Sequence, residues 1–396
     1  MTTQTDQQTI DTILNRATTN VLVRKDLEKK LKSGKSLRIK LGIDPTGSDL
    51  TLGHSVVLRK LKQYQDAGHH IILLFGSFTA QIGDPTGKSK TREPLTKEQV
   101  LKNAATYIEQ ASKVLDMDKV EVVYNDTWLE KLGFQDILEL ASVFTASQMM
   151  QRDMFQERIK AGNEVNLVEF LYPLMVSYDS VAIKADVEAG GSDQYFNLLC
   201  GRPMQEHFEQ APQNIFTTKL LVGTDGKEKM SKSLGNYIAL TADAKEIFGK
   251  IMSVPDSALE DYYECLTDFD MEEAKAHIAS DPRGAKIKLA QDIITWLHDE
   301  ASAEMALKDF ETKFVKKEIP DDIDEFKIEE SEIGILDLIT KVCNFAGSNS
   351  DARRLVTGGG VSINRDKIED PRAVLNIEGG EVLKVGKRKF GKLVKV

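Results

Sequence analysis

The stretch LRIKLGIDPTGSDLTLG, residues 37–53, decides the fold predicted for this chain, together with His54 directly after it. Apolar and more polar residues alternate from Leu37 to Ile43, which predicts a strand with one face better buried than the other. The segment DPTGSD is dense in turn-forming residues and ends this strand. Gly53 and His54 then open a segment whose apolar residues follow helical spacing.

A glycine and a histidine at a helix N-terminus just beyond a strand suit an anion. Free amide groups point outward there, the helix dipole favours negative charge, and glycine lets phosphate approach closely. A lone Gly-His pair is more often an ordinary strand–loop–helix connection. The second stretch, KMSKS at residues 229–233, is by itself a basic loop that solvent would surround. Together the two resemble the paired ATP signatures of class I aminoacyl-tRNA synthetases, in which a helix start and a mobile KMSKS loop close over ATP.

The composition bounds the class of protein. A chain of 396 residues is expected to hold two or three domains, and 41% hydrophobic with 29% charged residues is typical of globular proteins. No apolar run approaches ~20 residues, so no membrane span is expected. The N-terminus has no secretory pattern, and the three cysteines lie far apart, which predicts reduced thiols and a cytoplasmic protein. The net charge of −10 indicates that any contact with nucleic acid is local.

Alternation of helices and strands predicts an α/β fold with a doubly wound, Rossmann-like parallel sheet. The expected elements are a helix over 8–32, the strand after it, a strand at 70–75, a helix over 96–115, a strand at 120–124 and a helix from 134. Such sheets bind ligands beyond the carboxyl ends of their strands. The loops at Asp44 and Gly83 are expected at this edge, with Asn125.

The segment from Asn166 to Asp179 has helical spacing and is expected to be mostly core. Tyr172 and Asp179 lie seven residues apart, two turns on one face, so both can point into a pocket. Read alone, Asp179 is more often a capped or solvated helix residue. Residues 190–194 form a glycine turn that leads into another helix.

The chain divides into four predicted segments. The resemblance to the synthetases implies a catalytic domain over 1–228, followed over 229–317 by the KMSKS loop and a helical domain that binds the anticodon. Residues from about 235 are expected to be wholly helical. Residues 318–332 are crowded with acidic side chains and are predicted to be a linker with little to bury. Residues 333–396 form a small α+β domain with a basic cluster that favours a phosphate backbone. A solvated basic tail is the alternative for this cluster.

The chain resembles the bacterial tyrosyl-tRNA synthetases over nearly its full length. The motifs that carry the resemblance occur in order: GIDPTG with LGHS, GDPTGK, EFLYPLM with YD, GGSDQ and KMSKS. Tryptophanyl enzymes share the scaffold, but GIDPTG and the tyrosine–aspartate pocket pattern indicate tyrosine. The C-terminal segment resembles the RNA-binding module that these synthetases share with a ribosomal small-subunit protein.

The resemblance implies four sets of site residues. The catalytic set is His54, Thr51, Lys88, Arg92, Lys229 and Lys232. The ATP-binding set is Gly42, Asp44, Thr46, Gly53, His54, Gly191, Asp193, Lys229, Met230, Lys232 and Ser233. The tyrosine-binding set is Asp84, Asn125, Tyr172, Val176, Asp179 and Gln194. The RNA-binding set is Arg353, Arg354, Lys387, Arg388 and Lys389.

The resemblance also implies the reaction. Tyrosine is activated by ATP to tyrosyl-adenylate, pyrophosphate leaves, and the tyrosyl group passes to the 3′ end of tRNA(Tyr). Such a reaction is accelerated by positioning the two substrates and by stabilising the charge that develops in the transition state. The two KMSKS lysines suit the triphosphate, His54 the adenylate side, and Lys88 with Arg92 the leaving pyrophosphate. Mg²⁺ is implied with ATP, whereas no prosthetic group and no dedicated metal site are expected. A homodimer is typical of the family.

The remaining roles concern the substrates' polar groups. Asp193 suits the adenosine ribose, and Gln194 suits the region of the tyrosine carboxylate and the phosphate. Asp179 matches the position at the phenol hydroxyl of tyrosine. Tyr172 and Asp84 match positions at the α-ammonium, and Asn125 matches a position that supports the pocket.

Three departures from the family pattern stand in this sequence. Thr51 occupies the first histidine position of the usual His-x-Gly-His signature; its hydroxyl can bond a phosphate oxygen but carries no charge. Val176 replaces a glutamine that contacts the substrate amino group, and Lys40 stands where many members place a tyrosine at the phenol. Two alternatives follow: a catalytically weakened paralogue that binds RNA, and a different nucleotidyl transferase on the same scaffold. The intact KMSKS and GGSDQ argue against the first, and the helical middle domain with the RNA-binding tail against the second.

Overall fold

The structure is a computed structural model that describes residues 3–82, 95–318, 323–328, 332–364, 366–386 and 389–396. The chain divides into two units, Met1–Leu307 and Lys308–Val396. The division into four segments that the sequence suggests remains a prediction.

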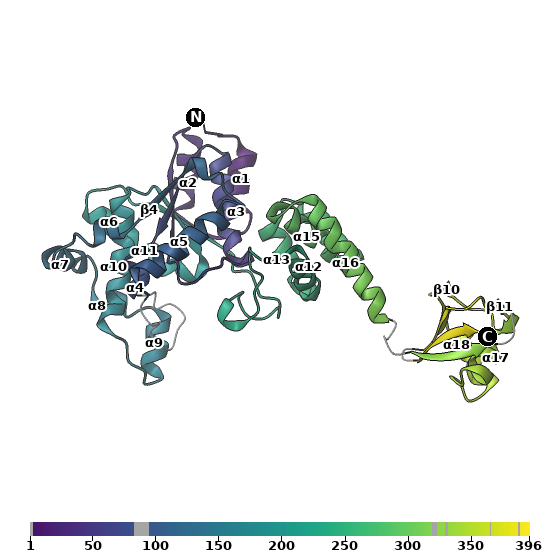
Figure 1. Cartoon of the computed structure of the whole chain (residues 1–396). Coiled ribbons are helices and arrows are strands. Elements are labelled where there is room, and N and C mark those ends of the chain that lie inside the picture. Colours follow the sequence, from purple (N-terminus) through teal and green to yellow (C-terminus); the bar gives the residue numbers. More distant parts are fainter. Residues whose placement is uncertain (1–2, 83–94, 319–322, 329–331, 365, 387–388) are drawn as a thin grey trace. The chain divides into compact units, whose positions relative to one another are not determined.

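Six strands form the sheet of the first unit, in the order β1-β6-β5-β2-β3-β4 (Figure 1). Their bounds are β1 Thr18–Leu22, β2 Arg38–Ile43, β3 His70–Phe75, β4 Val120–Tyr124, β5 Val187–Gly191 and β6 Asn214–Thr218. β1 pairs with β6 antiparallel and the other pairs are parallel. Strands β3 and β4 follow β2 on one side, and β5 lies on the other side of β2. The predicted doubly wound parallel sheet is confirmed.

Helices cover both faces of this sheet. On one face α3 (Leu52–Asp66) packs against β3, β5 and β6, and the ring of its Tyr64 stacks on Phe216 of β6 at 5.1 Å. On the other face Lys40 of β2 reaches the carbonyl of Val176 in α10 (Leu167–Ala182). Lys40 is fully buried, so the prediction that β2 buries mainly its apolar face is wrong at this residue.

Further helices of the first unit are α4 Thr79–Ile82, α5 Lys97–Ala111, α6 Asp126–Leu129, α7 Phe134–Ser142, α8 Ala146–Met149, α9 Asp153–Lys160 and α11 Tyr195–His207. The strands predicted at 70–75 and 120–124 match β3 and β4. The helix predicted over 96–115 is confirmed as α5, and the helix from 134 as α7.

The single helix predicted over residues 8–32 is wrong. Two helices, α1 (Gln7–Asn15) and α2 (Arg24–Lys32), flank the edge strand β1. Thr18–Leu22 is rich in β-branched residues, and its backbone bonds to β6 nearly two hundred residues away. A long-range partner therefore decides the structure of this segment, which its helical spacing of apolar residues conceals.

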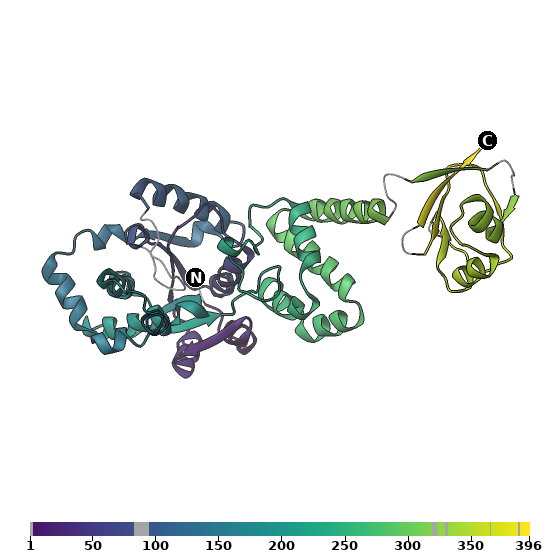
Figure 2. The same cartoon turned by 90° about the horizontal axis from the view of Figure 1, so that it is seen from below.

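Five helices follow the KMSKS segment (Figure 2). They are α12 Ala244–Ser253, α13 Leu259–Leu266, α14 Met271–Ser280, α15 Pro282–Leu297 and α16 Glu300–Glu318. The helical character predicted from about residue 235 begins at Ala244 instead, because residues 238–240 hydrogen-bond to residues 50–52. Among the residues that the structure describes, none lies in a helix long and apolar enough to cross a membrane.

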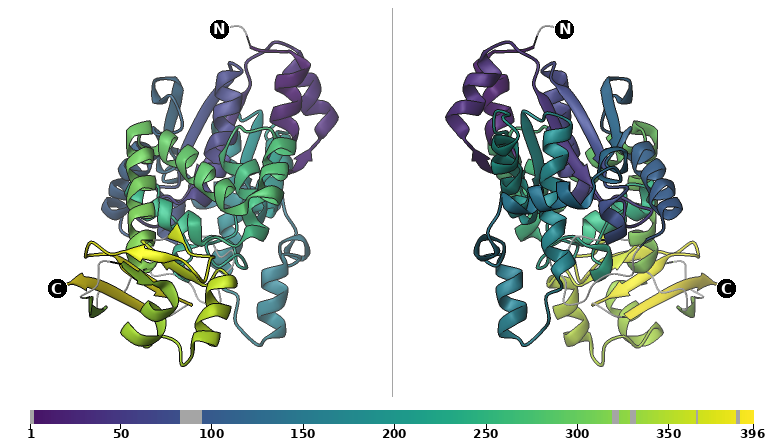
Figure 3. Two further views of the ribbon diagram at one scale, coloured as in Figure 1. Left: turned by 90° about the vertical axis from the view of Figure 1, so that its right-hand side faces the viewer. Right: turned by 90° about the vertical axis from the view of Figure 1, so that its left-hand side faces the viewer.

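The second unit holds a five-stranded sheet in the order β10-β9-β12-β13-β7, and α18 packs against it (Figure 3). The elements are β7 Asp324–Ile328, β8 Glu332–Gly334, α17 Ile335–Asp337, α18 Asn349–Thr357, β9 Val361–Ile363, β10 Asp366–Lys367, β11 Val374–Asn376, β12 Val382–Val385 and β13 Lys389–Lys395. Leu338, Leu383 and Leu393 are fully buried in its core. The small α+β domain predicted at this end is confirmed.

Part of the acidic segment predicted as a linker over 318–332 is folded instead. Its residues Asp324–Ile328 form β7, which pairs in parallel with β13. Phe326 packs against Phe345, and Ile328 is buried in the same core. Alternating apolar residues between the charges supply this packing, and the count of acidic side chains hides it.

Candidate functional site

The candidate site lies at the carboxyl edge of the sheet, where strand order reverses between β2 and β5. Asp44 follows the end of β2, and Asp193 lies in a short 3-10 turn directly after β5. Because the reversal sends the two flanking connections to opposite sides, the strand ends leave room for a ligand there.

The start of α3 and the KMSKS segment contact each other at this edge. A Cβ atom built on Gly53 would lie at an ordinary contact distance of 3.6 Å from Cβ of Met230, so the two segments lie against each other here. The ammonium of Lys232 would lie 2.8 Å from a Cβ on Gly47, and it donates to the carbonyl of Asp49. The two motifs predicted to act together are thus brought together by the fold.

His54 is held by the residue that caps its helix. The backbone N–H of Thr51 donates to Nδ1 of His54 at 3.1 Å, and the Thr51 hydroxyl oxygen lies 2.9 Å from the same nitrogen. An acceptor at Nδ1 assigns the ring proton to Nε2 in the neutral imidazole. Surrounding protein atoms and the charge of Lys232 lower the pKa of His54, although the residue as a whole is exposed. The ring is therefore a neutral donor at pH 7.

The first lysine of KMSKS reaches the turn after β5. Nζ of Lys229 lies 2.8 Å from Oδ2 of Asp193. The segment itself is fixed by Asn236, whose side-chain oxygen accepts from the N–H of Ser231 at 2.8 Å. The same Asn236 donates to Asp225 at 2.8 Å. One amide side chain thus holds the loop on which both lysines are carried.

Asp179 is a buried carboxylate on α10. Its Oδ2 accepts from Asn125 at 3.1 Å and its Oδ1 accepts from the indole N–H of Trp128 at 2.8 Å. Asn125 is oriented by the N–H of Phe78, which donates to its side-chain oxygen at 2.9 Å. Burial raises the pKa of Asp179 to about 6, against the lowering effect of Lys40 and of these two donors. The carboxylate keeps acceptor capacity for one further hydroxyl.

A second polar group lies between β2 and α10. The hydroxyl of Tyr172 donates to Oδ2 of Asp44 at 2.9 Å, and the hydroxyl of Thr79 donates to Oδ1 at 2.8 Å. A Cβ on Gly76 would lie 1.9 Å from that same oxygen, so only glycine admits the carboxylate. Asp44, predicted for ATP, and Tyr172, predicted for tyrosine, therefore contact one another at the junction of the two predicted subsites.

The other predicted residues fall into two groups. Asp84, Lys88 and Arg92 lie outside the residues that the structure describes. The following lie at or beside the carboxyl edge or on α10: Gly42 in β2, Thr46 in the loop after it, Gly191 at the end of β5, Gln194 beside Asn197, Ser233 beside Ser231, and Val176 on α10.

Three residues of this site carry no motif. Trp128 and Thr79 donate to the two carboxylates, and Gly76 makes room for one of them. All three follow the carboxyl ends of β3 and β4. Position at a strand end is therefore the signal that could have identified them.

The predicted RNA-binding residues lie in the second unit. Arg353 and Arg354 are exposed on α18, and Arg354 pairs with Asp351. Lys389 begins β13 and donates to the carbonyl of Phe345 at 2.6 Å. Lys387 and Arg388 lie outside the described residues. Their role in binding RNA remains a prediction.

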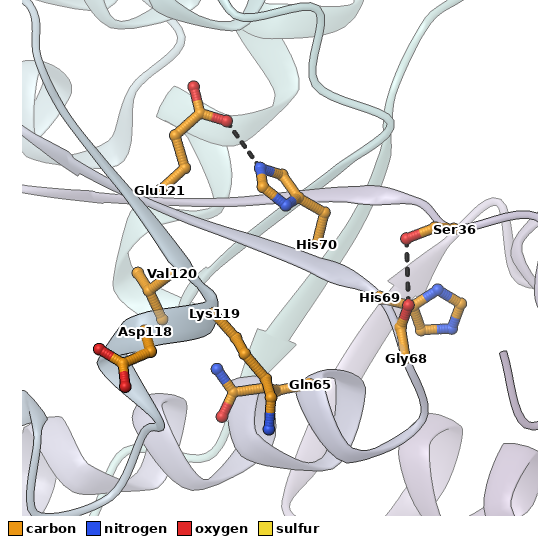
Figure 4. A pocket seen from close by; sticks show the side chains of 9 residues that line it. All are labelled: Ser36, Gln65, Gly68, His69, His70, Asp118, Lys119, Val120 and Glu121. Carbon is orange, nitrogen blue, oxygen red and sulfur yellow. Dashed lines mark hydrogen bonds and ion pairs between the residues drawn. The ribbon is translucent and has the colours of Figure 1, made fainter. Parts of the chain in front are cut away.

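A further cavity of about 410 Å³ lies at the opposite, amino-terminal edge of the sheet (Figure 4). His70 and Val120, which line it, begin β3 and β4. Nε2 of His70 lies 2.6 Å from Glu121, and the hydroxyl of Ser36 donates to the carbonyl of Gly68 at 3.1 Å. These polar groups are already paired, and none belongs to the predicted site.

Comparison with known proteins identifies the family. The profile described as "tRNA synthetases class I (W and Y)" matches residues 32–315. The tyrosine–tRNA ligase of Aquifex aeolicus is 46% identical over 383 residues, covering 96% of this chain and 97% of that protein. The tyrosine–tRNA ligase of Thermotoga maritima is also 46% identical, covering 96% of this chain and 95% of its own length. These relatives do not favour a non-enzymatic RNA-binding protein.

Solved structures support the fold. A C-terminally truncated mitochondrial tyrosyl-tRNA synthetase of Aspergillus nidulans superposes with a TM-score of 0.65 at 22% identity, covering 78% of this chain and 95% of that one. The tyrosyl-tRNA synthetase of Archaeoglobus fulgidus, complexed with L-tyrosine, gives 0.62 at 21% identity, with 76% and 99% covered. Together with the relatives, the carboxyl-edge site and its two motifs show that this chain belongs to the tyrosine–tRNA ligases of the class I tRNA synthetase family.

Proposed function

We propose that the carboxyl-edge site activates L-tyrosine with ATP and passes the tyrosyl group to tRNA(Tyr). The observation that carries this proposal is that residues 47–54 contact the KMSKS segment, while Asp44 just before them bonds to Tyr172 on α10, the helix that carries the buried Asp179. The two contacting segments supply donors for phosphate, and Asp179 supplies an acceptor for a hydroxyl group. Tyrosyl-adenylate carries a phosphate and a phenol hydroxyl in one molecule, so it needs both.

Tyrosine binds with its phenol at Asp179. The carboxylate accepts the phenol O–H, while Asn125 and Trp128 hold it in place. Phenylalanine offers no hydroxyl, so a buried carboxylate would lose a partner. The α-ammonium of tyrosine binds at Tyr172 and at Asp44, which accepts from it. Asp84, which the family resemblance also assigns to the ammonium, lies outside the described residues.

ATP binds across the start of α3. The Nε2–H of His54 donates to a phosphate oxygen, and the amide groups at the helix start favour the negative charge. Lys229 exchanges Asp193 for the triphosphate, which leaves the Asp193 carboxylate to the ribose hydroxyls. Lys232, already beside Gly47, reaches the same phosphates. Lys88 and Arg92 contribute further positive charge.

The chemical step is an in-line displacement at the α-phosphorus. An oxygen of the tyrosine carboxylate forms the new P–O bond, and the bond to the β-phosphate oxygen breaks as pyrophosphate leaves. No protein group forms a covalent bond; lysines and amide donors stabilise the charge that develops on the phosphate oxygens. Mg²⁺ accompanies the triphosphate. Among the described residues no group of three or more His, Cys, Asp or Glu is arranged to hold a metal, so the ion would rest mainly on the phosphates.

Two assembly properties belong to the same proposal. Large apolar side chains are exposed on α7 and the start of α10; these are Phe134, Leu138, Leu167 and Leu171. Exposed apolar residues gathered on neighbouring helices favour burial against a second copy, which supports a homodimer. The basic residues of the second unit support contact with the tRNA backbone. Charging of tRNA implies a cytoplasmic location, where translation takes place.

Tyrosine-dependent exchange of pyrophosphate into ATP tests the proposal, followed by the same assay with each other amino acid. The parent protein should exchange with tyrosine alone. Asp179→Asn should raise the KM for tyrosine about ten- to hundredfold, because a hydrogen bond to a charged group contributes roughly 1.5–3 kcal/mol. Asp118→Asn, an exposed carboxylate at the opposite edge of the sheet, is the matched control. Absence of exchange with any amino acid would refute the proposal.

A further inference from the structure

Lys40 and Glu188 form a buried ion pair against the turn of α10 that carries Asp179. The two residues face each other across the parallel pair β2 and β5. Nζ of Lys40 lies 2.8 Å from Oε1 of Glu188, and the two side chains are 0% and 2% exposed. Water is therefore excluded from both charges.

The hydrogen bonds of this pair are complete on the lysine side. Besides Glu188, the ammonium donates to the hydroxyl of Ser180 at 2.9 Å and to the carbonyl of Val176 at 3.1 Å. An ammonium has three donors, so none remains for a substrate phenol. Lys40 therefore does not replace, by direct contact, the tyrosine that many family members place at the phenol.

The two residues of α10 that bond to Lys40 lie on either side of Asp179 along the helix. Val176 and Ser180 lie on the turn that carries this carboxylate, so the ammonium fixes that turn against the sheet. Glu188 is held in place as well, since its second oxygen accepts from Ser180 at 3.1 Å and from Gln213. One closed polar network thus joins β2, β5 and α10.

Stability alone does not explain this pair. Burying two charges costs several kcal/mol per ion in desolvation, and replacing such pairs with apolar residues is often neutral or stabilising. A role in the adjacent site explains its presence better.

We propose that Lys40 and Glu188 are positioning residues of the tyrosine site, which hold the 176–180 turn and set the charge of Asp179 so that it accepts the substrate phenol. The inference rests on the proposed role of Asp179 in binding tyrosine.

The charged groups that act on Asp179 among the described residues come from two strands, Lys40 from β2 and Glu188 from β5; Asn125 and Trp128 are neutral donors. Lys40 lowers the pKa of Asp179 and Glu188 raises it. Removing the charge of Lys40 should therefore raise the pKa of Asp179, and removing the charge of Glu188 should lower it. When both charges are removed, the two shifts should largely cancel. A contribution from packing alone predicts no such opposition.

The test measures the KM for tyrosine against pH in the exchange assay, from about pH 5 to about pH 8. In the parent protein the KM should rise as the pH falls through the pKa of Asp179, about 6. Lys40→Met should move this acid limb up by about one unit or more, since a neighbouring opposite charge shifts a carboxyl by about 1–3 units. Glu188→Gln should move it down, and the double variant should return it toward the parent.

Lys60→Met is the control for loss of a buried ammonium. Lys60 is also buried, and its ammonium donates to the carbonyls of Thr12 and Ile13 at 3.2 and 2.9 Å. This variant should lose thermal stability without moving the acid limb. If Lys40→Met does not fold, Glu188→Gln decides alone: a downward shift supports the proposal, and an unmoved limb overturns it.

The outcomes separate this inference from the proposed function. If the parent exchanges with tyrosine and Asp179→Asn raises the KM, but Lys40→Met and Glu188→Gln shift the limb in the same direction or not at all, the inference is overturned and the function stands. If the parent shows no tyrosine-dependent exchange, the proposed function fails and the inference fails with it.

Discussion

Thr51 stands where the usual signature of the family has histidine, and its contacts predict how much that substitution matters. Its hydroxyl is fully buried and lies 2.9 Å from Nδ1 of His54, beside a backbone N–H that donates to the same nitrogen. We therefore expect Thr51 to influence ATP through the orientation of the His54 ring. The first interpretation, a direct bond from the hydroxyl to phosphate, fits a buried side chain less well.

The magnitude follows from what Thr51→Ala removes. The backbone N–H to Nδ1 contact survives, so the ring keeps its proton on Nε2. One neutral hydrogen bond is lost, which contributes about 0.5–1.5 kcal/mol. Since about 1.4 kcal/mol is one decade in rate, the kcat of tyrosine activation should fall by about tenfold or less. His54→Ala removes the donor itself and should cost more.

The assay is pyrophosphate–ATP exchange on a double-mutant cycle of Thr51→Ala and His54→Ala. If Thr51 acts through the ring, its substitution should have little effect once the ring is absent. Fully additive losses would refute this reasoning and return Thr51 to a direct contact with phosphate. Circular dichroism on each variant checks that the capped end of α3 has not unfolded, because loss of an N-cap also costs about 1 kcal/mol in stability.

Three other predictions follow from the structure. Lys232→Ala should lower the kcat of exchange about ten- to hundredfold while the KM for tyrosine changes little, because the lysine acts on phosphate in the transition state; equal changes in both would contradict its assignment. Gly76→Ala should displace the Asp44 carboxylate and raise the KM for tyrosine about tenfold, with a fall in melting temperature from overpacking; unchanged kinetics would show that Asp44 does not serve the ammonium. Removing residues 319–396 should leave exchange near the parent rate while tRNA charging collapses, and loss of exchange would show that the second unit is part of the catalytic fold.

Local pattern was sufficient where an element buries a run of apolar residues. In HIILLF at β3 every residue after His70 is apolar, so a strand covered on both faces is the arrangement that suits it. Local pattern also predicted the helices from Ala244 onward, because their apolar residues recur at helical spacing. Two of the family motifs, GIDPTG and GGSDQ, begin in the last residues of β2 and β5, so their residues lie at the carboxyl edge of the sheet.

Long-range pairing was hidden from such patterns. The segment Thr18–Leu22 became a strand because β6 lies beside it, and Asp324–Ile328 became a strand because β13 does. In both, the hydrogen-bonding partner lies more than sixty residues away, and no window of sequence contains both strands.

The sequence by itself determined the doubly wound class of this protein and its family, and it predicted a set of residues for the two substrate ends, because periodicity and motif order can be read along the chain. Only the tertiary structure decided how those residues work on one another. It placed the Thr51 backbone N–H on His54, the Trp128 indole on Asp179, and Lys40 against Glu188 beside the turn that carries Asp179. The physical reason is that hydrogen bonds and charge effects act over a few ångströms in space. The residues that interact at this short range come from different strands and helices, and their positions along the chain do not show that they are close in space.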